Sequence, residues 1–165
     1  MTAAVTMEEL LAWSEESSQF WKAHLDANPA LLELPCGIGK AVNVQDFVRH
    51  IWSAELRMGH RIAGLPLLTA KDVPPGPLDA LYDLHLQAVQ LFRALLDNPT
   101  QDWDATITFE YDWLPPHVRT ISKRKGLAHA LFHGQRHWAQ LATLVRSAGF
   151  PSQFNGDLLF SPAMK

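Results

Sequence analysis

Apolar side chains recur at the three- and four-residue intervals of an amphipathic helix in four separate stretches of this chain. In the first stretch the apolar positions are Leu10, Trp13, Phe20, Trp21 and Leu25. Thr6, followed three residues later by Glu9, has the pattern of a capping box at the start of a helix. Asn28-Pro29 is typical of a helix end. The sequence therefore predicts a first helix from Thr6 to about Asn28.

The second stretch begins at Asn43, a favourable N-cap residue, and has Asp46 in its first turn, where a negative charge complements the helix dipole. Gly64 and Pro66 are typical of a helix end. The stretch predicts a helix of about twenty residues with one buried face. That face is expected to consist of Phe47, His50, Ile51, Ala54, Met58 and Ile62.

The third stretch follows the stiff segment Val73–Pro77, and Pro77 suits the first turn of a helix. The stretch ends before Asn98-Pro99. Its predicted buried face consists of Leu78, Leu81, Tyr82, His85, Leu86, Val89, Phe92 and Leu96.

The apolar spacing changes before the last stretch, where β-branched residues alternate with others. We interpret Ala105–Tyr111 and His117–Ile121 as two short extended segments. The fourth helix is expected to begin near Ser122 or Lys123 and to end at Gly149. Four amphipathic helices of roughly twenty residues are what an all-α four-helix bundle requires, and such bundles commonly hold metal ions between facing helices.

Length and composition narrow the class of protein. A chain of 165 residues with 47% hydrophobic residues fits one domain, residues 1–165, with a buried core. The net charge is −3, and the one basic cluster is Lys123–Lys125, which is too short for the basic stripe of a nucleic-acid binder. We therefore expect no nucleic-acid partner.

The sequence also predicts a cytoplasmic protein with no membrane partner. Its longest apolar runs are shorter than the roughly 18 residues of a membrane-spanning helix, and no signal-peptide pattern is visible at the N-terminus. Cys36 is the single cysteine, which excludes an internal disulfide and fits a reducing compartment. A lone cysteine between Pro35 and Gly37 is interpreted as a small loop or core residue.

Three histidines in the fourth stretch, His129, His133 and His137, stand four residues apart and therefore share one helix face. Neutral imidazole is the commonest ligand of transition metals, and two imidazoles one turn apart can bind the same ion. Gly134 stands between the last two and costs about 1 kcal/mol of helix stability relative to alanine. Close approach of a ligand or a neighbouring helix is one reason to retain it.

His50 lies on the predicted inward face of the second helix. A buried imidazole needs a partner for each ring nitrogen, and a metal ion together with one hydrogen-bond acceptor would supply both. The alternative is a core histidine satisfied by protein groups alone. Glu55 on the same helix is either an acceptor behind a ligand or a plain surface charge.

The other histidines carry weaker predictions. His129 has three interpretations: a fourth ligand, a hydrogen-bonding neighbour of a ligand, or the wall of a pocket. We interpret the remaining four as structural or exposed, namely His24, His60, His85 and His117. The sequence contains no Gly-rich phosphate loop, no serine-nucleophile motif, no paired cysteine ligands and no His-Glu-x-x-His pattern of zinc proteases.

Two segments resemble the motifs of the DinB/YfiT-like superfamily. Residues 128–149, AHALFHGQRHWAQLATLVRSAG, are similar to its C-terminal signature, approximately His-x3-His-x2-Gln-Leu followed by a Leu-rich turn and Gly. Residues 49–55, RHIWSAE, resemble the motif on its second helix, a histidine followed by a helical Ala-Glu. The two segments occur in the order that the family has, and the helix plan covers nearly the whole chain.

The resemblance implies a four-helix bundle in up-down-down-up order, often a homodimer, with a divalent metal held by His50, His133 and His137. Three neutral imidazoles leave coordination positions open for water or a small-molecule substrate, as in catalytic metal sites. Zinc and nickel both fit this ligand set. Members of the superfamily include thiol-dependent S-transferases and a thiol-dependent maleylpyruvate isomerase, in which the metal would hold a low-molecular-weight thiol as thiolate.

The chain departs from the family after the last implied ligand. Many relatives have Arg-Gly-Gln there, whereas this chain has Trp138-Ala139-Gln140, which changes bulk and charge next to the metal. The expected function is a metal-dependent enzyme of the thiol S-transferase type. The alternatives are a metal-dependent hydrolase and a non-enzymatic metal- or ligand-binding bundle, for which no open metal position should face a cavity.

Overall fold

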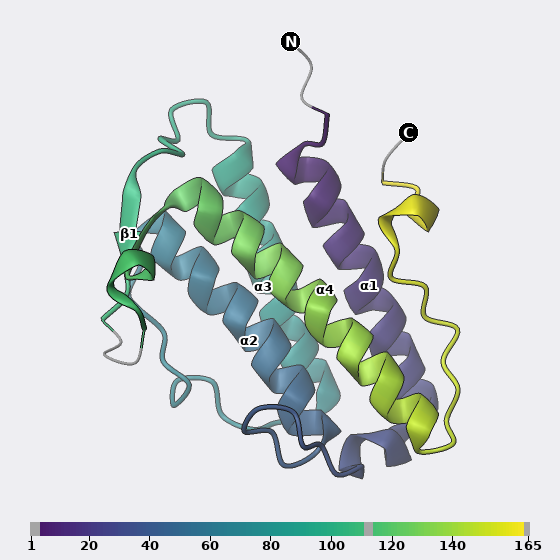
Figure 1. The fold of residues 1–165 in the computed structure, drawn as a ribbon. Coiled ribbons are helices and arrows are strands. Elements are labelled where there is room, and N and C mark those ends of the chain that lie inside the picture. The colour runs from purple at the N-terminus through teal and green to yellow at the C-terminus, as the bar shows by residue number, and fades with distance from the viewer. Residues whose placement is uncertain (1–3, 111–113, 164–165) are drawn as a thin grey trace.

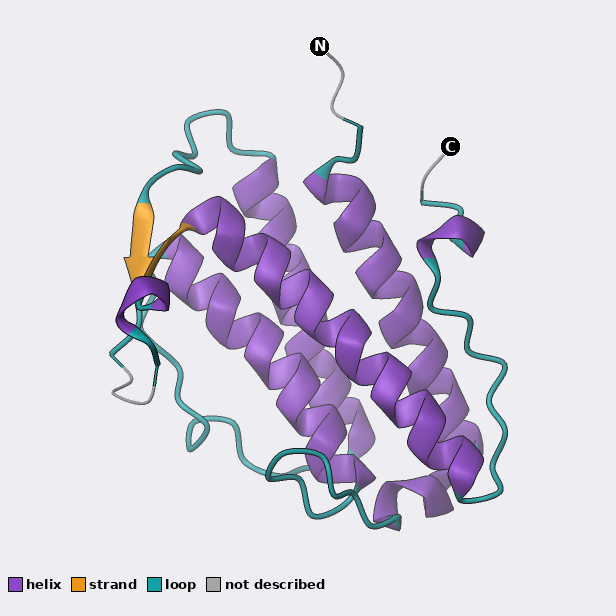
Figure 2. Cartoon of the chain, viewed as in Figure 1, coloured by secondary structure: helices purple, strands orange, loops and turns teal. Residues whose placement is uncertain are grey.

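The computed structural model describes residues 4–110 and 114–163, and four long helices dominate it (Figure 1). They are α1 (Met7–Ala27), α2 (Val44–Ala63), α3 (Leu78–Leu96) and α4 (Lys123–Ser147). Figure 2 shows the small sheet lying beside the start of α4; its strands are β1 (Thr106–Thr108) and β2 (Thr120–Ser122). The 3-10 helices are η1 (Pro29–Glu33), η2 (Pro116–Val118) and η3 (Leu158–Phe160). The four predicted helices are thus confirmed.

Capping residues fix the helix boundaries, as the sequence predicts. Thr6 and Glu9 form the capping box of α1, in which each side chain accepts a hydrogen bond from the other residue's backbone N–H. Asn43 and Ser122 each accept a hydrogen bond from the backbone N–H three residues later, at the starts of α2 and α4. Gly64 ends α2 with φ of 71°, a left-handed conformation that favours glycine.

Contacts between α2 and α3 show that these two helices run in the same direction. The Trp52 and Tyr82 rings are 5.3 Å apart, and further along both helices Gly59 lies against Phe92. Later residues of α2 therefore contact later residues of α3, as in a parallel pair of helices. The long connection between the two helices makes this parallel arrangement feasible, since the chain must return to the end where α2 began (Figure 1).

Helices α1 and α4 also run in the same direction as each other. Trp13 contacts Phe132, with ring centroids 6.3 Å apart, and Trp21 stacks on Trp138 at 5.8 Å. The pair α2 and α4 is antiparallel, because the later part of α4 approaches the earlier part of α2. The histidines of α4 therefore face the middle of α2.

Two apolar clusters form the core, one at each end of the helices. The first contains Trp21, Trp52 and Trp138, and the second contains Leu56 and Leu127. On every helix, buried polar residues occur along the sequence between positions of one cluster and positions of the other. These residues include Ser14, Ser17 and Ser18 on α1, Glu55 on α2, His85 on α3 and Gln135 on α4. We call this set the buried polar layer.

The extended segments before α4 are shorter than predicted. Strands β1 and β2 pair in antiparallel fashion, with Ile107 opposite Ile121. The prediction that His117 and Val118 are extended is wrong, because they belong to the 3-10 turn η2. Its start at Pro115-Pro116 explains this, since proline lacks the N–H that a sheet requires and suits the first position of a helical turn. Tyr111, the predicted end of the first segment, lies outside the described residues.

The buried faces of α2 and α3 also differ from the predicted ones. The face of α2 is wider, since Val48, Trp52, Glu55 and Leu56 are buried as well. The reason is that α2 contacts both α3 and α4 along its length. On α3, Leu86 is 41% exposed instead of buried. Within the described residues, none of the helices combines the length and the apolar character needed to cross a membrane.

Candidate metal centre

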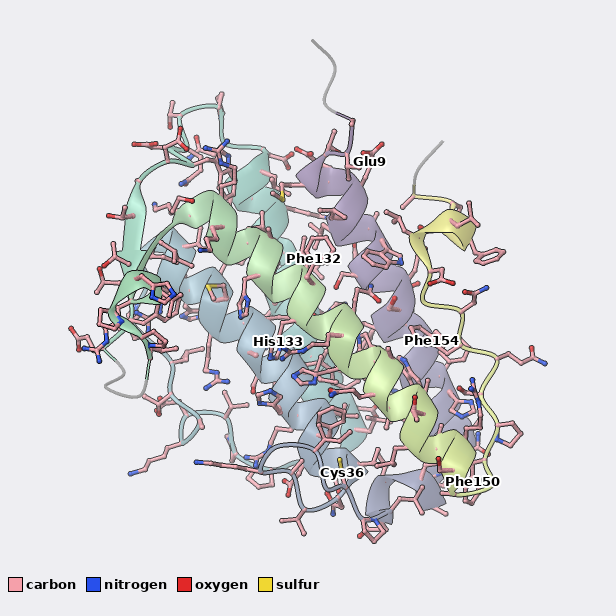
Figure 3. The ribbon with its side chains drawn as sticks, viewed as in Figure 1. Glu9, Cys36, Phe132, His133, Phe150 and Phe154 are labelled. Atoms are coloured by element: carbon pink, nitrogen blue, oxygen red, sulfur yellow. The ribbon has the colours of Figure 1, made fainter. Side chains whose placement is uncertain are left out.

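Three histidines from two helices come together where α4 packs against α2. His50 comes from α2, and His133 and His137 come from adjacent turns of α4. One ring nitrogen of each lies within 4.8 Å of those of the other two. The His50 ring centroid is 5.1 Å from that of His133 and 5.2 Å from that of His137. Figure 3 labels His133 on the part of α4 that passes over α2. The predicted convergence of these three rings is confirmed.

The spacing of the two α4 histidines fits a single transition-metal ion. Their Nε2 atoms are 3.1 Å apart. Two nitrogens bound to one ion at about 2.0–2.1 Å, in tetrahedral geometry, are separated by about 3.3 Å. The backbone of α4 therefore already presents His133 and His137 at the separation that a shared ion requires.

Hydrogen bonds fix the tautomer of His137. Its Nδ1 lies 2.6 Å from Oε1 of Gln140, one turn further along α4. Because an amide oxygen only accepts, Nδ1 carries the hydrogen and donates it, which leaves a lone pair on Nε2. The guanidinium of Arg136, which only donates, lies 3.3 Å from this Nε2 and agrees with the assignment. The nitrogen that faces His133 is thus the one able to bind a metal.

His133 turns its Nε2 to the same point. This nitrogen lies 3.1 Å from His137 Nε2, while Nδ1 of His133 is buried without a hydrogen-bond partner. An ion bound between the two Nε2 atoms would use the lone pair of each and leave the His133 hydrogen on Nδ1. Such a buried, unpaired polar atom costs free energy in a folded protein. It marks this ring as one whose position is set by something other than its own hydrogen bonds, as expected of a ligand.

The surroundings keep the three imidazoles neutral. Burial lowers the pKa of His133 to about 3, and the neighbouring His137 and His50 reinforce this. Loss of water around its ring lowers the pKa of His50 to about 4, and the neighbouring His137 and Arg57 would further disfavour a proton there. Burial also lowers the pKa of His137, although the hydrogen bond to Gln140 opposes it. A neutral ring is the form that binds metal.

One prediction about His50 is wrong. The sequence places it on the buried, inward face of the second helix, but the residue as a whole is exposed, although its ring is partly shielded from water. Phe47 and Ile51 on either side of it are buried, whereas the His50 ring lies at the edge of that face and borders a cavity. Water in the cavity can serve its second nitrogen, so the argument from burial does not apply to this histidine.

The cavity beside the three histidines has a volume of about 1150 Å³. It lies between α2 and α4 on one side and the segments around β1, η2 and the α2–α3 connection on the other. His129 lines it, with its ring centroid 5.6 Å from that of His133, and stands outside the three-histidine group. Of its three interpretations, the structure supports the pocket wall.

Glu55 is not a surface charge. Its side chain is 2% exposed, and Oε2 accepts a hydrogen bond of 2.7 Å from Nδ1 of His85 on α3. The other oxygen, Oε1, lies 3.0 Å from the point where a Cβ on Gly134 would stand. Gly134 is therefore needed for the close approach of α2 and α4, as the sequence suggested. The pairing of Glu55 with His85 was not predicted from the sequence.

The remaining histidines have structural or exposed positions, as predicted. His85 is buried, and His24 stacks on Phe20 at 5.7 Å between ring centroids. His60 makes a hydrogen bond of 3.0 Å to a backbone carbonyl, and His117 is exposed. The role of Gln140 was not predicted from the sequence, although a glutamine three residues after a histidine on one helix is within hydrogen-bonding reach.

The arrangement resembles a catalytic metal site more than a structural one. Structural zinc sites enclose the ion with four protein ligands, whereas catalytic sites use three and keep one position open. Within residues 4–110 and 114–163 the group consists of three histidines, and a cavity borders it. No protein-family model and no curated protein sequence matches this chain, so the chemistry is argued from these residues.

Proposed function

We propose that this chain is a DinB-like metalloenzyme in which His50, His133 and His137 hold one divalent transition metal, zinc or nickel, for a thiol-dependent transfer reaction. One observation carries the proposal: three neutral imidazoles, two of them with Nε2 atoms 3.1 Å apart, converge beside a cavity of about 1150 Å³. A binding module without catalysis would be expected to seal its ion from such a cavity.

A divalent ion in this ligand set would lower the pKa of a thiol or of water, so that either becomes a nucleophile at neutral pH. The protein's own contribution is to hold the ligand rings. Gln140 keeps the lone pair of His137 on Nε2, and the absence of a side chain at Gly134 leaves room for Glu55 between α2 and α4. Outer partners of this kind orient metal ligands and tune their basicity.

The size of the cavity is sufficient for transfer between two organic molecules. Pockets for one small molecule usually measure about 300–1000 Å³. A volume of about 1150 Å³ leaves room for a low-molecular-weight thiol together with an electrophile. A hydrolase needs space for only one organic substrate and water.

Helix directions support the family assignment within this proposal. Helices α1 and α4 share one direction and α2 and α3 share the opposite one, which agrees with the up-down-down-up order expected of a DinB-like bundle. We extend the proposal to the homodimer that is common in that superfamily.

Metal content tests the centre directly. Protein purified without a histidine tag should contain, or take up on soaking, about one equivalent of zinc or nickel per chain, as measured by elemental analysis. The matched variant His133→Ala should take up none, while His129→Ala should behave like the wild type. A wild-type protein with less than about a tenth of an equivalent after soaking would refute the centre.

The reaction class needs a second assay. Metal-loaded protein is mixed with a low-molecular-weight thiol and 1-chloro-2,4-dinitrobenzene, and formation of the thioether is followed by absorbance. In this reaction a carbon–sulfur bond forms, chloride leaves, and the thiol proton passes to solvent. We expect acceleration by the wild type and none by His133→Ala. A protein that binds metal but accelerates the reaction of no physiological thiol would contradict the transferase assignment, and ester hydrolysis would then be the next assay.

A further inference from the structure

The cavity beside the three histidines has an uneven charge. Among the described residues that line it, one carries a carboxylate, Asp46, which lies 3.2 Å from Arg49. Five carry a positive charge, namely Lys40, Arg49, Arg57, Arg61 and Lys125. Positive side chains therefore predominate on the described walls, and a concave surface of one sign concentrates ligands of the opposite sign.

The positive side chains continue along the same helix faces as the metal centre. Arg57 and Arg61 follow His50 by seven and eleven residues, which are two and three helical turns, so the three lie on one face of α2. At 1.5 Å per residue, Arg57 lies about 10 Å from His50 along the helix axis and Arg61 about 16 Å. Ala54 lines the cavity between them and leaves the floor open.

The facing helix repeats this arrangement. On α4, Lys125 precedes His133 by eight residues and therefore also stands about two turns from the centre. It lines the same cavity. The histidines thus lie at one end of the space between α2 and α4, and positive charges from both helices lie at the other.

The wall opposite α2 and α4 is apolar. Its side chains come from the α2–α3 connection and from the segments around the small sheet: Leu68, Val73, Phe109, Leu114, Val118 and Ile121. The Arg61 guanidinium stacks on the Phe109 ring, 4.6 Å from its centroid, and donates a hydrogen bond to the backbone carbonyl of Thr108. These contacts fix Arg61 beside the apolar wall.

We propose that this cavity binds an anionic small molecule with an apolar body, whose anionic oxygens bind near Arg57 and Arg61 while its other end lies at the metal centre. The inference rests on the proposed metalloenzyme function and narrows the substrate class. The distance along α2 suits a molecule about 10 Å long. Arginine is well suited to carboxylate and phosphate because its planar group donates two parallel hydrogen bonds.

The lining of the cavity distinguishes between anionic and neutral substrates. Its described walls combine five positive side chains with an apolar face. A negatively charged substrate with an apolar body therefore gains from both, whereas a neutral one gains only from the apolar wall.

Metal-free protein and two fluorescent probes test the proposal. The probes are 1-anilinonaphthalene-8-sulfonate, which is anionic and apolar, and the neutral N-phenyl-1-naphthylamine. We expect the anionic probe to bind about tenfold more tightly than the neutral one. Arg57→Gln should weaken the anionic probe about tenfold and leave the neutral probe unchanged, while Arg57→Lys should retain most of the affinity. Lys125→Gln, at an exposed position on the facing helix, is an independent variant that should also weaken binding of the anionic probe.

Control variants locate the probes. Arg146→Gln removes an exposed arginine from the end of α4, away from the cavity, and should change neither affinity. Ala54→Phe fills the cavity floor and should abolish binding of both probes, with its fold checked by circular dichroism. Equal affinity for the two probes, Arg57→Gln and Lys125→Gln variants that match Arg146→Gln, or unchanged binding by Ala54→Phe would each overturn the proposal.

Two further measurements separate this site from the metal centre. Displacement of the anionic probe by benzoate or by phenyl phosphate identifies the preferred anionic group, and displacement by either supports the site. Zinc uptake by Arg57→Gln should equal that of the wild type. A protein that prefers the anionic probe but takes up no metal would refute the metalloenzyme proposal and retain the anion site. A protein that takes up metal but shows no preference for the anionic probe would refute the anion site and retain the metal centre.

Discussion

Glu55 of α2 and His85 of α3 form a hydrogen bond of 2.7 Å, with each side chain 2% exposed. The pair lies within the buried polar layer, between the two apolar clusters of the core. Burial of two polar groups is costly unless they pair, so the bond between Oε2 and Nδ1 favours one alignment of α2 and α3. The other carboxylate oxygen of Glu55, Oε1, is buried without a hydrogen-bond partner. Glu55 also packs closely against Gly134, since its Oε1 lies 3.0 Å from the point where a Cβ would stand, so the same carboxylate lies between three helices.

Loss of His85 should destabilise the protein strongly. His85→Leu leaves the Glu55 carboxylate buried without its partner, and removal of one member of a buried pair typically costs about 3–5 kcal/mol. The double variant Glu55→Gln/His85→Leu should lose less, because no charge stays buried. Urea unfolding of the metal-free protein measures both.

The surface pair of Glu15 and Arg93, with an N–O distance of 2.7 Å, supplies the control. Glu15→Gln should cost about 0–1 kcal/mol, since exposed pairs contribute little. A His85→Leu variant as stable as Glu15→Gln would show that the buried pair does not hold α2 and α3 together.

The helices could be predicted from patterns of neighbouring residues in the sequence. The contacts between helices could not be predicted in this way. Thr6 and Asn43 cap helices through residues three positions away, so their roles can be read from the sequence. The spacing of His133 and His137 is equally local. The pairing of Glu55 with His85 depends on the parallel course and the register of α2 and α3, which no local pattern contains.

The position of His50 illustrates the same limit. Apolar spacing placed it on the buried face, but its exposure is decided by a cavity that distant segments around β1 and η2 enclose. Its approach to the α4 histidines was expected both from that inward-facing position and from the family resemblance. The cavity and its charges could not be predicted, because they arise from segments that meet only in the folded chain.

Gly134→Ala should destabilise the protein despite the better helix propensity of alanine. The new Cβ would lie 3.0 Å from Glu55 Oε1, and the carboxylate cannot turn away without breaking its bond to His85. Overpacking costs about 1–3 kcal/mol, against a propensity gain of about 1 kcal/mol, so we expect a net loss of about 1 kcal/mol. Thermal unfolding measures this.

Gly37→Ala is the control, because nothing lies within 4 Å of its added Cβ. This variant should leave the midpoint of thermal unfolding unchanged. A Gly134→Ala protein more stable than the wild type would mean that α2 and α4 can separate freely at this point.

His133→Ala should abolish metal binding but leave the protein folded. The apolar clusters at both ends of the helices do not include His133, and most single substitutions cost about 1 kcal/mol. The matched control is His129→Ala, which removes a cavity-lining histidine and should retain metal affinity. Circular dichroism and metal titration test both variants. Complete unfolding of His133→Ala would mean that the residue is needed for the fold itself.

Gln140→Leu should weaken metal binding although Gln140 does not belong to the ligand group. The variant removes the acceptor that holds the hydrogen on His137 Nδ1. Loss of such an outer partner typically lowers metal affinity about 10- to 100-fold. Gln140→Glu keeps an acceptor at the same place and should retain affinity. Competition with a chromophoric chelator measures the constants, and equal affinity of Gln140→Leu and wild type would contradict the role of Gln140.

Acid should destabilise the metal-free protein through its histidines. Unfolded histidine has a pKa near 6.5, whereas burial lowers the pKa of His133 to about 3 and that of His50 to about 4. Below about pH 6.5 the unfolded chain therefore binds protons that the native protein does not bind. Stability is full above this pH and should fall as the pH is lowered towards about 3.

The variant His133→Asn isolates this effect, because it removes one group that takes up a proton on unfolding. Its melting temperature should fall less steeply between pH 7 and pH 4 than that of the wild type. His117→Asn, at an exposed position outside the cavity, is the control and should follow the wild type. Parallel pH profiles for His133→Asn and wild type would show that the His133 ring is protonated as readily in the native protein as in the unfolded chain. Such a ring would bind a metal ion only in competition with protons at mildly acidic pH.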